Sequence, residues 1–243
     1  MKKPILCLLA FLSFISVQAQ DSSSYTHHRI GIDFGVAIPS GFFAATDKDN
    51  IQAAYAKNGY DFNISYEYQF HKYLSATIQG GATGFFIDED EMEDQIIRAN
   101  GPQFTKPEAK TTAHAIGSAL VGIKGIYGTK VIKVYVNPVF GYSRMRSAEL
   151  ALSKTDINGS SSLLQEAYMS DMTMIYGINY GAWVQLTDFI DLRVNVGHLS
   201  SEYDLEPEIS TTDNAGNKTD VVDTKFKQPF ETVNITAGIG FNF

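Results

Sequence analysis

The sequence predicts an all-β protein: an eight-stranded antiparallel transmembrane β-barrel with short periplasmic turns and long extracellular loops. Three observations predict this class. Apolar and polar residues alternate with period two in eight separate segments. The connections between these segments alternate between short and long, and the chain begins with the features of a secretory signal.

Residues 1–19 have the features of a cleaved signal peptide. Two lysines follow the first Met, an apolar run covers residues 5–17, and residues 17–19 (VQA) have the small-x-small spacing of a signal peptidase site. The apolar run is shorter than the roughly 20 residues that a membrane-spanning helix needs. The sequence therefore predicts one outer-membrane barrel domain that covers residues 20–243.

Composition limits the partners of this domain. Cys7 is the only cysteine and lies in the signal, so the mature chain would contain no disulfide bond. The formal net charge of -8 becomes more negative once the two lysines of the signal are removed. This acidity argues against a nucleic-acid partner. No zinc-spaced cysteine pair, phosphate loop or nucleotide fingerprint is present, so we expect no metal and no cofactor.

Eight segments predict the strands, and each has one apolar face. The clearest two cover residues 30–38 and 60–70, and the fourth segment is the weakest because both of its faces are apolar or small. In that fourth segment we place Lys124 on the polar face. The remaining predicted strands cover residues 74–83, 115–128, 132–143, 171–186, 190–196 and 234–243.

The connections predict where water lies. Three connections are tight turns, written HKY, YGTK and TDF in the sequence, and the other four are long and polar. The acidic run IDEDEMED in the second long connection is interpreted as a solvated loop, because it lacks the glycine of a calcium loop. Closure into a barrel gives the backbone N–H and C=O groups of every strand edge a hydrogen-bond partner within the membrane. A barrel of eight strands has a lumen only wide enough for side chains.

The final segment GIGFNF and the segment YGINYGAWVQLTDFIDLRVNVG resemble the small eight-stranded outer-membrane β-barrels of Gram-negative bacteria, the OmpA-like and OmpX-like family. The resemblance implies a monomer in the cell outer membrane, in contact with lipid and lipopolysaccharide. It also implies that the barrel-assembly machinery reads Phe241 and Phe243 as an assembly signal. The family fixes an architecture more than an activity.

Charged residues on the predicted inner faces gather toward the periplasmic half of the barrel. Buried charges persist when they are paired, so these residues predict a salt-bridged plug rather than a narrow, gated ion path, which is the alternative. The five residues are Glu67, Lys124, Lys133, Asp191 and Arg193.

We expect a structural, adhesive or surface-interaction role through the long loops, without enzymatic activity and with an unknown extracellular ligand. A lipid A deacylase is the alternative. Counting by twos places His198, Ser200 and Glu231 together on the outward face, in the residue types that acyl transfer requires. The three resemble the His-x-Ser motif and later Glu of lipid A 3-O-deacylases, although Ser201 stands where that family has Asn. A soluble secreted barrel is disfavoured because the outward rows are apolar throughout.

Overall fold

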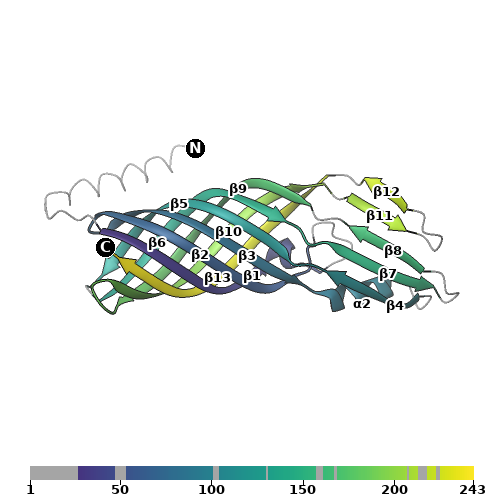
Figure 1. Cartoon of the computed structure of the whole chain (residues 1–243), viewed down its shortest axis with the longest axis horizontal. Helices are drawn as coiled ribbons and strands as arrows, with labels where there is room; N and C mark the ends of the chain where they lie inside the picture. Colours follow the sequence, from purple (N-terminus) through teal and green to yellow (C-terminus); the bar gives the residue numbers. More distant parts are fainter. Residues whose placement is uncertain are drawn as a thin grey trace, which may run out of the picture.

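The computed structural model describes residues 27–46, 53–100, 104–129, 131–156, 161–166, 169–206, 208–212, 218–222 and 225–243, so the predicted signal peptide lies outside the described residues. Eight long antiparallel strands form a closed barrel (Figure 1). They are β1 (His27–Ser40), β2 (Ala56–His71), β3 (Leu74–Ile87), β5 (His114–Gly128), β6 (Ile132–Arg146), β9 (Ser170–Gln185), β10 (Ile190–Leu205) and β13 (Phe226–Asn242).

The barrel closes between its first and last strands. The strand order is β1-β13-β10-β9-β6-β5-β3-β2, and β2 pairs with β1 in turn. At the seam, the backbone N–H groups of His28 and Phe243 each donate to the carbonyl oxygen of the other residue, at 3.0 Å. We call this end of the barrel, where the three tight connections also lie, the turn end, and the opposite end the loop end.

The eight-strand prediction is confirmed, and each predicted segment lies within one of the barrel strands, apart from one residue at the end of the sixth and one at the end of the last. Two strands are much longer than their alternation indicates. The predicted strand 190–196 extends to Leu205, and the strand predicted to begin at Asn234 begins at Phe226. These extensions carry charged residues on their outward face, which ends the apolar pattern without ending the strand.

The outer and inner surfaces of the barrel reverse the arrangement of a soluble protein. Exposed apolar side chains cover the outward face of every barrel strand, with Phe34, Phe62, Ile78, Val121, Phe140, Tyr180, Val194 and Ile239 as one example from each. Buried polar side chains fill the inside, among them Asp33, Ser65, Thr77, Lys124, Asn137, Arg193 and Thr236. An apolar band around a closed barrel with a polar interior is the arrangement that spans a membrane. In the part of the chain that the structure describes, no helix has the length and hydropathy to cross a membrane.

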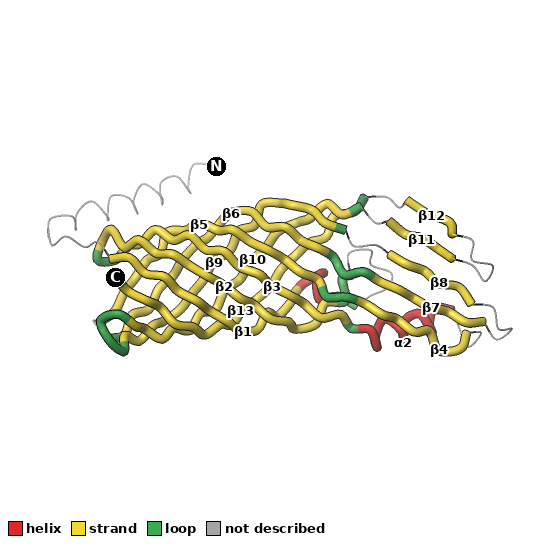
Figure 2. Tube along the Cα trace, viewed as in Figure 1, coloured by secondary structure: helices red, strands yellow, loops and turns green. Residues whose placement is uncertain are grey.

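A second sheet continues from the loop end (Figure 2). Its five strands run in the order β12-β11-β8-β7-β4, where β4 is Phe104–Thr111, β7 Leu150–Asp156, β8 Ser161–Glu166, β11 Glu208–Thr212 and β12 Lys218–Val222. We expected polar loops here. The strands are short and mostly polar, so the sequence carries no alternation strong enough to predict them.

The acidic run is also ordered, which corrects its interpretation as a solvated loop. It forms the beginning of α2 (Glu89–Asn100), which packs against β4. One oxygen of Glu89 accepts hydrogen bonds from the backbone N–H of Thr111 at 2.8 Å and from its hydroxyl at 2.6 Å. Glu93 accepts from the N–H of Ala109 at 3.0 Å. The carboxylates thus satisfy backbone donors at the free edge of β4, and acidic residues in a first turn also favour the helix.

Candidate functional site

The turn end of the lumen is closed by a network of ion pairs centred on Glu67. Its Oε2 atom lies 2.5 Å from Lys124 Nζ and 3.5 Å from an Arg29 nitrogen, and its Oε1 accepts from the Ser75 hydroxyl at 2.8 Å. Arg29 Nε lies 3.0 Å from Asp191 Oδ2. All of these side chains are buried, and their charges are paired with one another within the lumen.

A second ion pair lies one layer further into the barrel. Arg193 donates from Nε to Asp33 Oδ1 at 2.6 Å and from a terminal nitrogen to Oδ2 at 2.5 Å. The same terminal nitrogen donates to the Ser65 hydroxyl at 2.8 Å. This two-pronged geometry is the strongest form of an arginine–carboxylate pair, and here it joins β10 to β1 and β2.

Two aromatic side chains pack among these charges. The Arg29 guanidinium lies 4.1 Å from the ring centre of Trp183, and Lys124 Nζ lies 4.3 Å from that of Tyr135. Lys133 is half-buried, and its Nζ lies 5.8 Å from the Trp183 ring. Within the described residues it forms no ion pair. Four of the five predicted lumen charges therefore belong to the buried ion pairs, and Lys133 lies at their edge.

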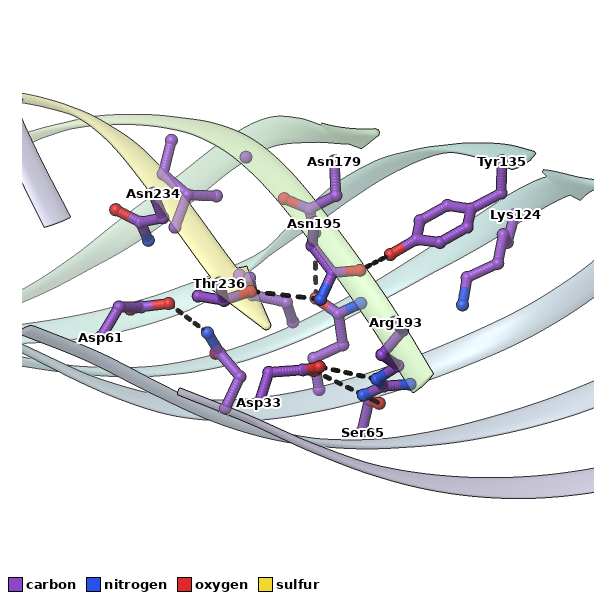
Figure 3. Close-up of a pocket in the computed structure, with 15 residues that line it drawn as sticks. Asp33, Asp61, Ser65, Lys124, Tyr135, Asn179, Arg193, Asn195, Asn234 and Thr236 are labelled. Atoms are coloured by element: carbon purple, nitrogen blue, oxygen red, sulfur yellow. Dashed lines mark hydrogen bonds and ion pairs between the residues drawn. The ribbon is translucent and has the colours of Figure 1, made fainter. Parts of the chain in front are cut away.

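A small polar cavity occupies the middle of the lumen (Figure 3). Its volume is about 50 Å³, enough for a few water molecules. Asp61 reaches it from β2, with its Oδ1 accepting from the Thr83 hydroxyl at 2.6 Å and its Oδ2 accepting from the Asn63 amide. Other polar lining comes from Asn179, Asn195, Asn234 and Thr236.

An aromatic cluster closes the loop end of the lumen. The short 3-10 helix η1 (Gly41–Ala44) follows β1 and places Phe43 inside the barrel mouth, where it is fully buried. The Phe43 ring lies 5.1 Å from the ring of Phe85 and 5.1 Å from that of Phe230, both in edge-on geometry. Tyr203 packs on Phe230 at 6.1 Å. The lumen therefore has an apolar cover at one end and ion pairs at the other.

Beside this cluster, His114 contacts three other segments of the chain, at Ala54, Ala148 and Phe43. Its Nε2 lies 3.1 Å from the carbonyl oxygen of Ala54, and its Nδ1 accepts a hydrogen bond from the N–H of Ala148 at 3.0 Å. The ring also packs against Phe43 at 5.3 Å. Only a neutral ring with its proton on Nε2 satisfies both bonds, since a doubly protonated ring would turn an N–H toward the N–H of Ala148.

His198, Ser200 and Glu231 lie on the outward face of the barrel near its loop end. Ser200 and Glu231 are directly opposite each other across β10 and β13, and His198 is opposite Val233. Within the described residues no hydrogen bond joins any two of the three. The Glu231 carboxylate instead lies over Gly41, which has φ of 60° and where a side-chain Cβ would meet a carboxylate oxygen at 3.2 Å. The trio shares a face but does not assemble into a nucleophile, base and orienting acid.

No family model matches the sequence, and no curated protein sequence matches it. Solved structures do match at 12–13% identity. The match to Neisserial surface protein A covers 89% of this chain and 97% of the Neisserial chain, with a TM-score of 0.48. The match to the attachment invasion locus protein Ail of Yersinia pestis covers 90% of this chain and 99% of Ail, with a TM-score of 0.46. The match to OprG of Pseudomonas aeruginosa covers 90% of this chain and 97% of OprG, with a TM-score of 0.49. At this identity and TM-score the likenesses support no shared role.

The deciding observation is the closed barrel of eight antiparallel strands with an apolar exterior and a filled polar interior. The chain is a small eight-stranded outer-membrane β-barrel.

Sequence reasoning missed several residues that seal this outer-membrane barrel. Arg29 precedes the first clear alternating segment. Counting by twos does place Asp33 on the inner face of β1, but the predicted set of lumen charges does not include it. Phe43 carries no such signal, because it follows the strand in a turn of 3-10 helix. Its place in the lumen depends on how η1 folds back over the barrel mouth.

Proposed function

We propose that this barrel is a sealed membrane anchor that presents its second sheet at the cell surface for structural or adhesive contacts. The observation that carries the proposal is the combination of a closed lumen with a sheet of five strands that continues from the loop end. A barrel filled in this way provides no path for a solute, which leaves the projecting sheet as the part available to a partner.

The lumen supports the first half of the proposal. Buried ion pairs around Glu67 and Arg193 fill its turn end, and the packed rings of Phe43, Phe85 and Phe230 fill its loop end. Between them lies the cavity of about 50 Å³. Eight strands give a barrel whose interior side chains alone can fill, which agrees with this packing.

The rim of the barrel supports the second half. At the loop end the outward side chains of β10 and β13 become charged, and Glu202 pairs with Lys227 at 2.5 Å. Such exposed pairs contribute little to stability, but they mark where the surface leaves lipid for water. We infer that the second sheet lies wholly beyond this level and faces the outside of the cell.

The test of surface exposure uses an epitope inserted between Thr212 and Lys218, in the connection from β11 to β12. We expect an antibody to label the epitope on intact cells as strongly as on permeabilised cells. The matched control places the same epitope in the short turn between β3 and β2, at residues 72–73, where labelling should require permeabilisation. The opposite labelling pattern would reverse the orientation and remove the proposal.

The test of the sealed lumen is electrical. We expect purified protein in planar bilayers to give no steady conductance, because ion pairs and aromatic rings close both ends of the lumen. A large, stable pore in the unmodified protein would contradict the proposal, whatever the result of the surface labelling.

The contact role is tested separately, with cells that produce the full chain or a variant in which residues 207–224 are replaced by a short Gly-Ser linker. We expect the cells with the full chain to adhere better to one another or to a surface coated with extracellular-matrix protein. Equal adherence at equal barrel abundance would contradict the adhesive role and leave only the structural one.

A further inference from the structure

Among the described residues of the lumen, Asp61 is the one buried carboxylate that forms no ion pair. Asp61 is 1% exposed, and among the described residues its oxygens accept hydrogen bonds from two groups, the Thr83 hydroxyl and the Asn63 amide, both of which are neutral. Within the described residues, no Lys, Arg or His forms an ion pair with it. A charged group in such a position is costly unless a counter-charge is supplied or a proton neutralises it.

The other buried carboxylates of the lumen already have their cations. Glu67 is paired with Lys124 and Arg29, Asp191 with Arg29, and Asp33 with Arg193. Four buried carboxylates therefore face three buried cations within the described residues, and Asp61 is the one left over. Lys133 is too far toward the turn end to compensate it, since it lies at Trp183 and does not line the cavity around Asp61.

Two cationic side chains also line this cavity, and both are paired with other carboxylates, Lys124 with Glu67 and Arg193 with Asp33. The Nε and one terminal nitrogen of Arg193 donate to the two oxygens of Asp33, and that terminal nitrogen also donates to Ser65. Asp33 lines the same cavity as Asp61, so the surroundings add a second carboxylate rather than a free positive charge.

The cavity beside Asp61 suits a small cation. It has a volume of about 50 Å³ and lies between the ion pairs and the aromatic cover. Amide and hydroxyl groups line it, from Asn63, Asn179, Asn195, Asn234 and Thr236 (Figure 3). Oxygen atoms of this kind are ligands for hard cations, and the space allows a few water molecules to complete a coordination shell.

We propose that this cavity binds one monovalent alkali cation, Na⁺ or K⁺, next to Asp61. A single uncompensated negative charge matches a single positive one. A divalent ion such as Ca²⁺ would need several carboxylate oxygens at the same point, and those of Asp33 are held by Arg193.

The first experiment measures the thermal unfolding of the refolded barrel in detergent at constant pH and ionic strength. The barrel is refolded separately at each ratio of choline chloride to NaCl or KCl, because both ends of the lumen are closed and choline is too large for the cavity. A ligand that binds only the folded state raises the unfolding midpoint as its concentration rises. We expect the midpoint to increase with Na⁺ or K⁺ and to stay constant in choline alone.

Two variants locate the effect. Asp61→Asn keeps the acceptor for Thr83 but removes the charge, so we expect it to abolish the dependence on the cation and to unfold in choline at a higher temperature than the unmodified protein. The matched control is Asp191→Asn, which removes a buried carboxylate that is paired with Arg29, and neither of these two residues lines the cavity. It should lower the midpoint but keep the dependence on the cation.

A second measurement does not rely on any variant. The barrel is refolded in ²²Na⁺, separated from free ions by gel filtration, and then unfolded by heat. Because both ends of the lumen are closed, we expect about one ion per barrel to remain through the column and to be released on unfolding. The proposal is overturned if no ion is retained and the midpoint does not respond to Na⁺ or K⁺, since a proton on Asp61 would then account for the buried carboxylate.

Discussion

At Arg193, one guanidinium group connects three strands, with Asp33 on β1 and Ser65 on β2 as its partners. Arg193→Ala would leave Asp33 buried without a counter-charge. We therefore expect a loss of about 3–5 kcal/mol in the free energy of unfolding. Urea unfolding of the barrel in lipid vesicles measures it, with the fluorescence of Trp183, the single tryptophan, as the signal.

The double variant Asp33→Asn with Arg193→Met serves as the control. It removes both charges and leaves neither buried group ionised, so most of the lost stability should return. If the Arg193→Ala variant unfolds at the same urea concentration as the unmodified protein, the ion pair does not contribute to the free energy of unfolding and the prediction is wrong.

For a single residue, the sequence predicts which face of its strand the side chain lies on, but not which side chains it contacts. Counting by twos placed Glu67, Lys124, Asp191 and Arg193 on the inner face, where the structure buries them. Counting by twos does not predict which of these residues form ion pairs, because the partner across the lumen depends on how the barrel closes and on the tilt of its strands. Arg193 and Asp33 are 160 positions apart, and nothing local in either segment indicates their pairing.

Among the elements, η1 determines how the loop end is closed. Phe43→Ala would leave a cavity between Phe85 and Phe230, and such a truncation of a buried Phe costs about 3–5 kcal/mol. Phe42→Ala is the matched control, because Phe42 lies next to it in the same turn but is 52% exposed. In the same urea experiment, Phe42→Ala should have a much smaller effect, and equal effects of the two would show that Phe43 does not pack in the lumen.

His114 makes the contacts at the loop end sensitive to acid. The folded protein holds the ring neutral, whereas in the unfolded chain the ring gains a proton below about pH 6.5. The unfolded state then binds more protons, so stability should fall as the pH drops below that value. Thermal unfolding of the unmodified protein between pH 8 and pH 5 measures the decrease.

His114→Gln provides the comparison for this pH dependence. Its amide can donate toward Ala54 and accept from Ala148, but it does not titrate between pH 5 and pH 8. We expect the variant to lose less stability than the unmodified protein over that range. Identical pH profiles would assign the change to other groups.

The elements that the sequence did not predict share a physical cause. The barrel strands have an apolar face because lipid requires one, and this produces the alternation that the sequence shows. β7, β11 and β12 belong to the second sheet and not to the barrel, so the requirement for a lipid-facing side does not apply to them. α2 begins in a run of acidic residues that resembles a solvated loop, and its contacts with β4 come from Glu89 and Glu93, which no periodicity marks.

For the whole molecule, a closed barrel predicts a characteristic behaviour on gels. The strands have no free edge, so detergent should not unfold the barrel until it is heated. We expect the protein to fractionate with outer membranes and to migrate faster when the sample is not boiled. Recovery in the soluble periplasmic fraction, without detergent, would contradict this expectation.

The same gel tests the proposed assembly signal. The Phe243 ring is 64% exposed and stacks on His28 at 5.8 Å, and Phe241 is also exposed, so both rings are accessible at the turn end. We expect Phe243→Ala to reduce the heat-shifted band in cells. Phe189→Ala, an exposed ring in a turn at the same end, should leave that band unchanged.

With the second sheet outside the lipid, as proposed above, a membrane crowded with copies of this barrel would bring many second sheets close together. Bare strand edges at such density would join into shared, growing sheets. Along β4, however, the N–H groups of Ala109 and Thr111 are already taken by carboxylates of α2. A neighbouring copy would find these two donors already bonded, so we expect the copies to remain separate molecules along this part of the edge.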